Sequence, residues 1–126
     1  MEKELRHELT TNIPELENAT YPTNAPEGVT KPYLVYARIT TNKIKTLSGY
    51  TNKQALSYMY SIMAPKCGDM IAVRDKVEAL LLSLPQRQIG EDGSIYVEDL
   101  TINNISETWE PELKVNRGII DFTIYI

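Results

Sequence analysis

This sequence offers few residues that could take part in covalent catalysis or bind a metal ion. Of its 126 residues, Cys67 is the only cysteine and His7 is the only histidine. A lone cysteine excludes an internal disulfide, so stability must come from core packing or self-association, and a secreted domain stapled by disulfides is excluded. A lone histidine needs a carboxylate, a cysteine or a second ligand beside it before it can act in catalysis or metal binding.

Long apolar runs are also absent. No stretch approaches the roughly 18 consecutive apolar residues of a membrane-spanning helix, and the first six residues lack the apolar run of a signal peptide. We therefore expect no membrane partner and a protein that stays in the cytosol where it is made. Because 42% of the residues are hydrophobic and 24% are charged, residues 1–126 are predicted to form a single globular domain.

Charge of one sign is missing from two long segments. From Gly28 to Gly68 there is no acidic residue, and from Glu91 to Glu112 there is no Lys or Arg. The net charge of −4 argues against a domain that holds nucleic acid by bulk attraction to phosphates. The separation of the basic segment from the acidic segment suits head-to-tail association, in which the positive surface of one subunit meets the negative surface of the next. The alternative is an ordinary scatter of charges over a solvated surface.

Two amphipathic helices are predicted from the spacing of apolar residues. The apolar line of the first is Leu5, Leu9 and Ile13. Pro14 ends this helix because proline lacks an amide donor. A longer helix runs from Asp69 to Leu84, with Asp69 as its N-cap and Pro85 as its stop. We expect this second helix to lie across a sheet.

The rest of the chain is predicted to be strands and connections. The expected strands are Tyr33–Thr41, Ala55–Ala64, Ser94–Ile105, Glu107–Val115 and Ile119–Ile126. Residues 14–32 form an ordered loop, and residues 40–54 form a long hairpin connection with a short paired segment around Ile44–Leu47. Asp92-Gly93 is a two-residue hairpin signal. The predicted fold class is α+β, a largely antiparallel sheet packed against the N-terminal helix and one longer amphipathic helix.

The last strand carries two predictions. Its core face is Ile120, Phe122, Ile124 and Ile126, because alternate residues of a strand share a face. If the strand lies at a sheet edge, its unpaired backbone groups are a means of recruiting a neighbouring subunit.

For each single candidate residue, a structural role explains the sequence better than a catalytic role. Cys67 precedes Gly68 and Asp69 at the N-terminus of the longer predicted helix, and a thiol beside the positive end of a helix dipole is a candidate nucleophile. Nothing in the sequence nominates a base to partner it, so a small residue in a turn is the favoured interpretation. His7 lies off the apolar line of its helix and is expected to face solvent or the helix flank.

The acidic and aromatic residues likewise have both a functional and a structural interpretation. Four acidic residues suggest calcium ligands: Glu91, Asp92, Glu98 and Asp99. They lack the spacing of a calcium loop, so solvated turns explain them better. Four tyrosines fall on adjacent predicted strands: Tyr33, Tyr36, Tyr58 and Tyr60. They suit base stacking or an interface hot spot, and equally a sheet built from good strand formers. No catalytic, cofactor-binding or metal residue is assigned.

The pattern over nearly the whole chain resembles the tail-completion proteins of long-tailed bacteriophages, also called tail terminators or head-to-tail joining proteins. The resembling pieces are the leucine-bearing first helix, Tyr21-Pro22, Ala25-Pro26-Glu27-Gly28, Pro32-Tyr33-Leu34-Val35-Tyr36, Leu47-Ser48-Gly49, the helix from Asp69 to Leu84, and Arg117 to Tyr125. The resemblance implies a non-enzymatic virion protein that caps the finished tail tube as a ring, commonly a hexamer. It also implies contact with the tail-tube protein and the head connector, assembly in the host cytoplasm, and no cofactor.

The resemblance leaves the segment Thr40–Lys53 open, because its dense lysines depart from strongly similar members. It faces the DNA lumen, the connector or a neighbouring subunit. The candidate interface residues are Lys43, Lys45, Gly49, Tyr50, Lys53, Glu107, Glu110 and Glu112. Genome DNA is expected to pass through the lumen without specific binding. The alternatives are another neck or minor tail component, a small cytosolic enzyme using Cys67, and a nucleic-acid-binding module using the basic hairpin.

Overall fold

The computed structural model describes residues 2–17, 19–22, 32–112 and 114–126. Its helices are α1 (Glu2–Asn12), the short 3-10 helix η1 (Pro14–Leu16) and α2 (Cys67–Ser83). Its strands are β1 (Thr20–Pro22), β2 (Tyr33–Thr46), β3 (Gly49–Ala64), β4 (Arg87–Ile89), β5 (Ile95–Val97), β6 (Asp99–Glu110) and β7 (Val115–Tyr125). The predicted Ala25-Pro26-Glu27-Gly28 turn lies outside the described residues.

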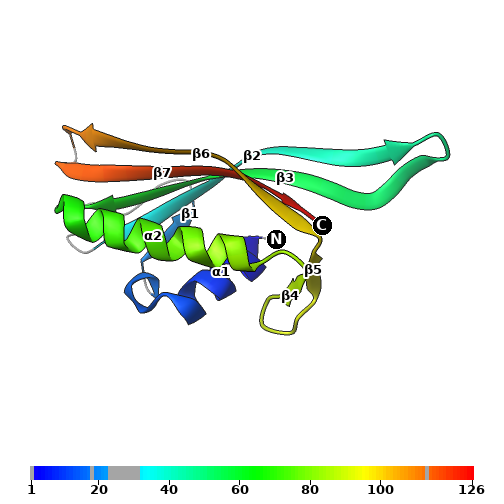
Figure 1. The fold of residues 1–126 in the computed structure, drawn as a ribbon, viewed down its shortest axis with the longest axis horizontal. Coiled ribbons are helices and arrows are strands. Elements are labelled where there is room, and N and C mark those ends of the chain that lie inside the picture. The colour runs from blue at the N-terminus through cyan, green and yellow to red at the C-terminus, as the bar shows by residue number, and fades with distance from the viewer. Residues whose placement is uncertain (1, 18, 23–31, 113) are drawn as a thin grey trace.

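Five strands form one sheet in the order β1-β2-β3-β7-β6, and β4 and β5 form a separate pair. Neighbouring strands run antiparallel except β1 and β2, which run parallel. Both α-helices lie on the same side of the five-stranded sheet (Figure 1). The predicted α+β class is confirmed, although η1 and β1 lie in a segment that was predicted to be loop.

The main core lies between the sheet and the two helices. Ile120, Phe122 and Ile124 of β7 point to this side, and each is 0% exposed. The facing residues of β3 are Leu56, Tyr58, Tyr60 and Ile62. The helices contribute Leu5, Leu9, Met70, Val73, Val77, Leu80 and Leu81. The apolar faces predicted for both helices and for the last strand are therefore confirmed.

Helix α2 begins earlier than predicted. Its N-cap is Lys66, which has an extended backbone and makes no side-chain capping hydrogen bond. Asp69 is therefore not the N-cap, because Cys67 already has helical geometry. Asp69 lies in the first turn, where its carboxylate is close to the positive end of the helix dipole. The helix ends at Ser83, and Pro85 follows as expected.

The connection between β2 and β3 is a paired ribbon and not a loop. The two strands pair as far as Thr46 and Gly49, so only the two residues between these form the turn. A long hairpin connection with only a short paired segment around Ile44–Leu47 was predicted over residues 40–54, because Asn42, Gly49 and Asn52 are turn formers among polar residues. Polarity reports that side chains are solvated, but the backbone N–H and C=O groups of the two segments still satisfy each other.

The segments after α2 also divide differently from the prediction. Ser106 was expected to separate two strands, yet it lies within β6, opposite Ile119. The chain turns instead between Glu110 and Val115, where Lys114 has a positive φ of 55°. A serine carries no backbone restriction that ends a strand, whereas a reversal of the chain needs a turn.

The closing strand is central in the sheet. β7 pairs with β3 on one side and with β6 on the other, so neighbours occupy both of its edges. The hypothesis that residues 119–126 recruit a subunit through an open edge is therefore wrong. The edge on this side of the sheet is β6, because the β6–β7 hairpin places β6 outside β7.

Three of the four tyrosines predicted on adjacent strands are buried in the core, and the fourth, Tyr36, is partly buried against it. Tyr58 and Tyr60 are buried against Phe122, with ring centroids 5.6 and 4.8 Å from its ring. Burial raises the pKa of the Tyr60 phenol well above its ordinary value. Tyr33 is buried in a second cluster, where its ring lies edge-on to Tyr21 at 6.2 Å. Tyr33, Tyr58 and Tyr60 are core residues, so they are not available to stack on bases.

Candidate functional site

The β2–β3 hairpin projects from the molecule as a two-stranded ribbon. Beyond the position where β7 ends, the two strands continue with each other as partners, and Figure 1 shows this ribbon reaching far past the helices. Lys43 and Lys45 lie on β2 in the ribbon and are exposed. Tyr50 pairs with Lys45, and Gly49 has a φ of 116°, a left-handed conformation that suits glycine at the turn.

Apolar side chains interrupt the polar surface of the ribbon at three places. Ile39 lies at a register shift between Arg38 and Thr40, and 57% of it is exposed. Ile44 lies at the second register shift and is also exposed. Leu47 is in the turn and is fully exposed. Bulges re-aim side chains, so the irregular positions of this ribbon are the ones that present apolar groups to solvent.

The β6–β7 hairpin ends at the opposite end of the molecule's longest axis (Figure 1). Its edge strand carries Ile105, Glu107 and Trp109 at alternate positions, so these three share a face. Glu107 forms an ion pair with Arg74 of α2, which places this face on the helix side of the sheet. Trp109 is 51% exposed. The acidic end therefore also presents an apolar side chain to solvent.

The structure assigns the predicted interface residues to these two ends. Lys43, Lys45, Gly49, Tyr50 and Lys53 belong to the ribbon, and Glu107, Glu110 and Glu112 belong to the β6–β7 end. The separation is only partial in space, because Glu98 of the base-free segment pairs with Lys53 of the ribbon, and Lys114 and Arg117 lie on the β6–β7 hairpin with its acids.

Lys53, Glu107 and Glu110 are among the predicted charges that already have partners within the chain. Lys53 pairs with Glu98, Glu107 pairs with Arg74, and Arg117 donates a hydrogen bond of 3.1 Å to Glu110. These pairs are partly exposed, so they contribute little to stability and remain open to a second partner. Glu112 is exposed in the turn. The sequence analysis did not identify the exposed apolar residues Ile44, Leu47, Ile105 and Trp109. Each is an apolar residue within a polar, charged run, and this pattern could have indicated its exposure.

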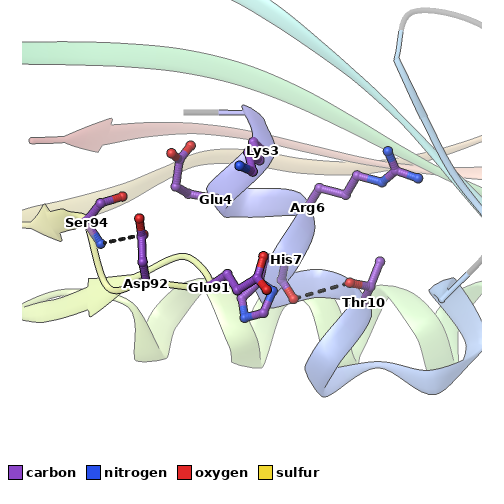
Figure 2. Close-up of a pocket in the computed structure, with 8 residues that line it drawn as sticks. All are labelled: Lys3, Glu4, Arg6, His7, Thr10, Glu91, Asp92 and Ser94. Carbon is purple, nitrogen blue, oxygen red and sulfur yellow. Dashed lines mark hydrogen bonds between the residues drawn. The ribbon is translucent and has the colours of Figure 1, made fainter.

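A separate cavity of about 470 Å³ lies between α1 and the β4–β5 connection. Its lining residues are Lys3, Glu4, Arg6, His7, Thr10, Glu91, Asp92 and Ser94 (Figure 2). The Ser94 amide donates a 3.1 Å hydrogen bond to Asp92, and bonding from Ser94 holds the pKa of Asp92 below its ordinary value. The connection spans residues 90–94, which is longer than the two-residue turn predicted at Asp92-Gly93.

This cavity gives the lone histidine acidic neighbours that the sequence did not supply. His7 and two predicted calcium candidates, Glu91 and Asp92, line the same space. Within the described part of the chain, no three His, Cys, Asp or Glu residues are grouped so that they could hold a metal ion. Cys67 is exposed at the start of α2, away from these lining residues in the sequence and absent from the cavity wall.

The helices of the described ranges include none that is long and apolar enough to cross a membrane.

Comparison with known proteins identifies a shared fold. No protein-family model matches the chain, and no curated protein matches it in sequence. A chain in the solved structure of the virion of a native gene transfer agent particle has the same fold, with a TM-score of 0.66. The two sequences are 11% identical, and the alignment covers 93% of this chain and 82% of the other. The likeness extends over nearly the whole chain and shows the fold that the two have in common.

Proposed function

We propose that this protein is a virion assembly protein that caps the tail tube as a ring and joins it to the head connector. The observation that carries the proposal is the placement of two exposed hairpin tips at opposite ends of one molecule, a lysine-bearing ribbon and a β6–β7 end that carries Glu107, Glu110 and Glu112. A contact between two different ends of identical subunits is heterologous, and heterologous contacts close into rings when the rotation between neighbours allows it.

Two further observations support a role in a virion. The fold also occurs in a chain of a gene transfer agent virion, across 93% of the present chain. The sequence pattern resembles tail-completion proteins, for which a ring, commonly a hexamer, is the usual assembly. In this proposal the partners are other copies of the chain, the tail-tube protein and the head connector, and the function is recognition without catalysis.

The ring would stand where the tail meets the head, so genome DNA would pass through its lumen. The net charge of −4 opposes tight adsorption of the chain to phosphates. In this proposal DNA passes without specific contact, and the ribbon faces protein partners.

Light scattering and negative-stain microscopy of the purified protein, alone and with tail tubes that lack a terminator, test this function. Rings and tubes of uniform length that end in one ring are expected. The proposal fails if the protein is a strict monomer at all concentrations and does not bind tail tubes. Attachment elsewhere in the virion would indicate another neck or minor tail component.

The Cys67→Ser variant separates assembly from thiol chemistry. Cys67 is exposed, and no described residue forms a hydrogen bond with its thiol, so its replacement is expected to leave ring formation and tube capping unchanged. Loss of function in a variant that still folds would favour the enzyme alternative. DNA binding that persists at moderate salt would favour the nucleic-acid-binding alternative.

A further inference from the structure

Two surfaces of the molecule match each other in chemistry and cannot meet within one chain. The ribbon surface is formed by Lys43, Ile44, Lys45 and Leu47. The edge surface is formed by Ile105, Glu107 and Trp109 on β6. We propose that the ribbon surface of one copy docks on the edge surface of a second copy, with β6 accepting the neighbour's ribbon as an added strand. This proposal rests on the proposed function and names the interface between subunits.

The edge strand β6 has an open row of backbone groups. It spans Asp99–Glu110 and pairs only with β7 among the described strands. A long edge strand is a template for pairing with another chain, and proteins usually shorten or cover such edges. The single register shift in β6 lies between Ile102 and Asn104, so the part from Asn104 to Glu110 is regular and open to a partner.

Among the described strands, none pairs with the ribbon beyond the end of β7. A two-stranded hairpin is marginally stable by itself in water, and three strands or a packed face are needed for independent stability. The ribbon nevertheless exposes Ile44 and Leu47 among lysine, threonine and asparagine side chains. Docking on another copy would bury these groups and add the missing strand.

Charge and apolar character are complementary between the two surfaces. Leu47 and Ile44 would contact Trp109 and Ile105, and tryptophan is the residue type most enriched in interface hot spots. The ribbon lysines would approach Glu107, whose pairing with Arg74 leaves it 47% exposed at the side chain. The described ribbon beyond Arg38 has no carboxylate to repel this edge, because residues 28–68 contain no acid.

Site-specific crosslinking tests the contact in the full chain. In a Cys67→Ser background, one variant carries Leu47→Cys and a second carries Trp109→Cys; both replaced side chains are at least half exposed, so folding should be retained. Mixing the two single-cysteine proteins under mild oxidation should give a disulfide-linked heterodimer. A chain with both cysteines should give a ladder of covalent oligomers up to the size of the ring. The matched control is Leu47→Cys mixed with Leu82→Cys, since Leu82 is 58% exposed on α2, outside both surfaces.

The possible outcomes show separately whether the proposed interface and the proposed function are correct. The interface is supported if positions 47 and 109 crosslink at least about tenfold faster than positions 47 and 82. It is also supported if the Trp109→Ala variant self-associates at least about tenfold more weakly. If rings cap tubes but the two pairs crosslink equally, the interface is wrong and the function stands. If positions 47 and 109 crosslink but the assemblies never bind tail tubes, the interface stands and the function is wrong. A strict monomer without crosslinks overturns both.

Discussion

At the scale of single residues, Gly118 sets how closely α2 approaches the sheet. It lies on β7 in the same row as Ile120, opposite Glu107 of β6. A Cβ atom at this position would lie 2.6 Å from Sδ of Met70 and 3.1 Å from Cδ of Arg74. Met70 is buried, and Arg74 is held by Glu107. The absence of a side chain at Gly118 thus allows the first turns of α2 to pack on β7.

The Gly118→Ala substitution is expected to destabilise the protein by about 1–3 kcal/mol, the usual cost of overpacking a core. Urea unfolding monitored by circular dichroism measures this free energy. Gly68→Ala is the matched control, because Gly68 is in the first turn of α2 and a Cβ there meets nothing within 4 Å. This control is expected to be neutral or to stabilise by less than about 1 kcal/mol. Equal effects of the two substitutions would show that α2 can shift freely on the sheet.

At the scale of elements, the ribbon is separable from the folded core. None of the side chains described between Ile44 and Lys53 is buried. Gln54, at the base of the ribbon, exchanges two backbone hydrogen bonds with Ile126, and these mark the point where the sheet proper begins. Under the proposed interface, assembly and stability depend on different parts of β2 and β3.

Replacing residues 44–53 by Asn-Gly should leave the domain folded and abolish assembly. Lys43 and Gln54 pair across the strands, so a two-residue turn can join them. The exposed Lys53–Glu98 ion pair is lost and no buried side chain is removed from the described part of the ribbon, so the free energy of unfolding should change by less than about 1 kcal/mol. Urea unfolding and light scattering measure the two effects. A trimmed chain that still caps tail tubes would contradict the ribbon–edge interface and leave the capping function standing.

At the scale of the whole molecule, the two ends of the longest axis differ in their charged residues. The ribbon carries lysines and no acid, whereas the β6–β7 end carries Glu107, Glu110 and Glu112 together with Lys114 and Arg117. Attraction between such ends is screened by salt, because the Debye length falls from about 30 Å at 0.01 M to about 3 Å at 1 M ionic strength.

Self-association is therefore expected to weaken as sodium chloride rises from low to high concentration. Sedimentation velocity over a series of salt concentrations measures the dissociation constant at each. The double variant Lys43→Gln and Lys45→Gln should associate more weakly at low salt and show a smaller salt dependence. Association that is unchanged or stronger at high salt would indicate a contact held by apolar groups alone.

Local pattern determined much of the fold in advance. The stripe of α2 and the alternation of β7 identified buried faces correctly, because the spacing of apolar side chains reports which face is buried whatever element covers it. The parallel strand β1 was missed, since three residues around Pro22 are too few to show a period. The ribbon was underestimated because its strands are held by backbone bonds that polar side chains do not reveal.

The sequence by itself determined the α+β class, the two helices, the core faces and the segregation of charge. Only the tertiary structure decided that β7 is central and β6 is the edge, that the ribbon and the acidic hairpin lie at opposite ends, and that Lys53, Glu107 and Glu110 have internal partners. Strand order and ion pairing depend on which distant segments meet. Which segments meet is set by the packing of the whole sheet on its helices. This packing produces no periodic pattern of residues that could be recognised in the sequence.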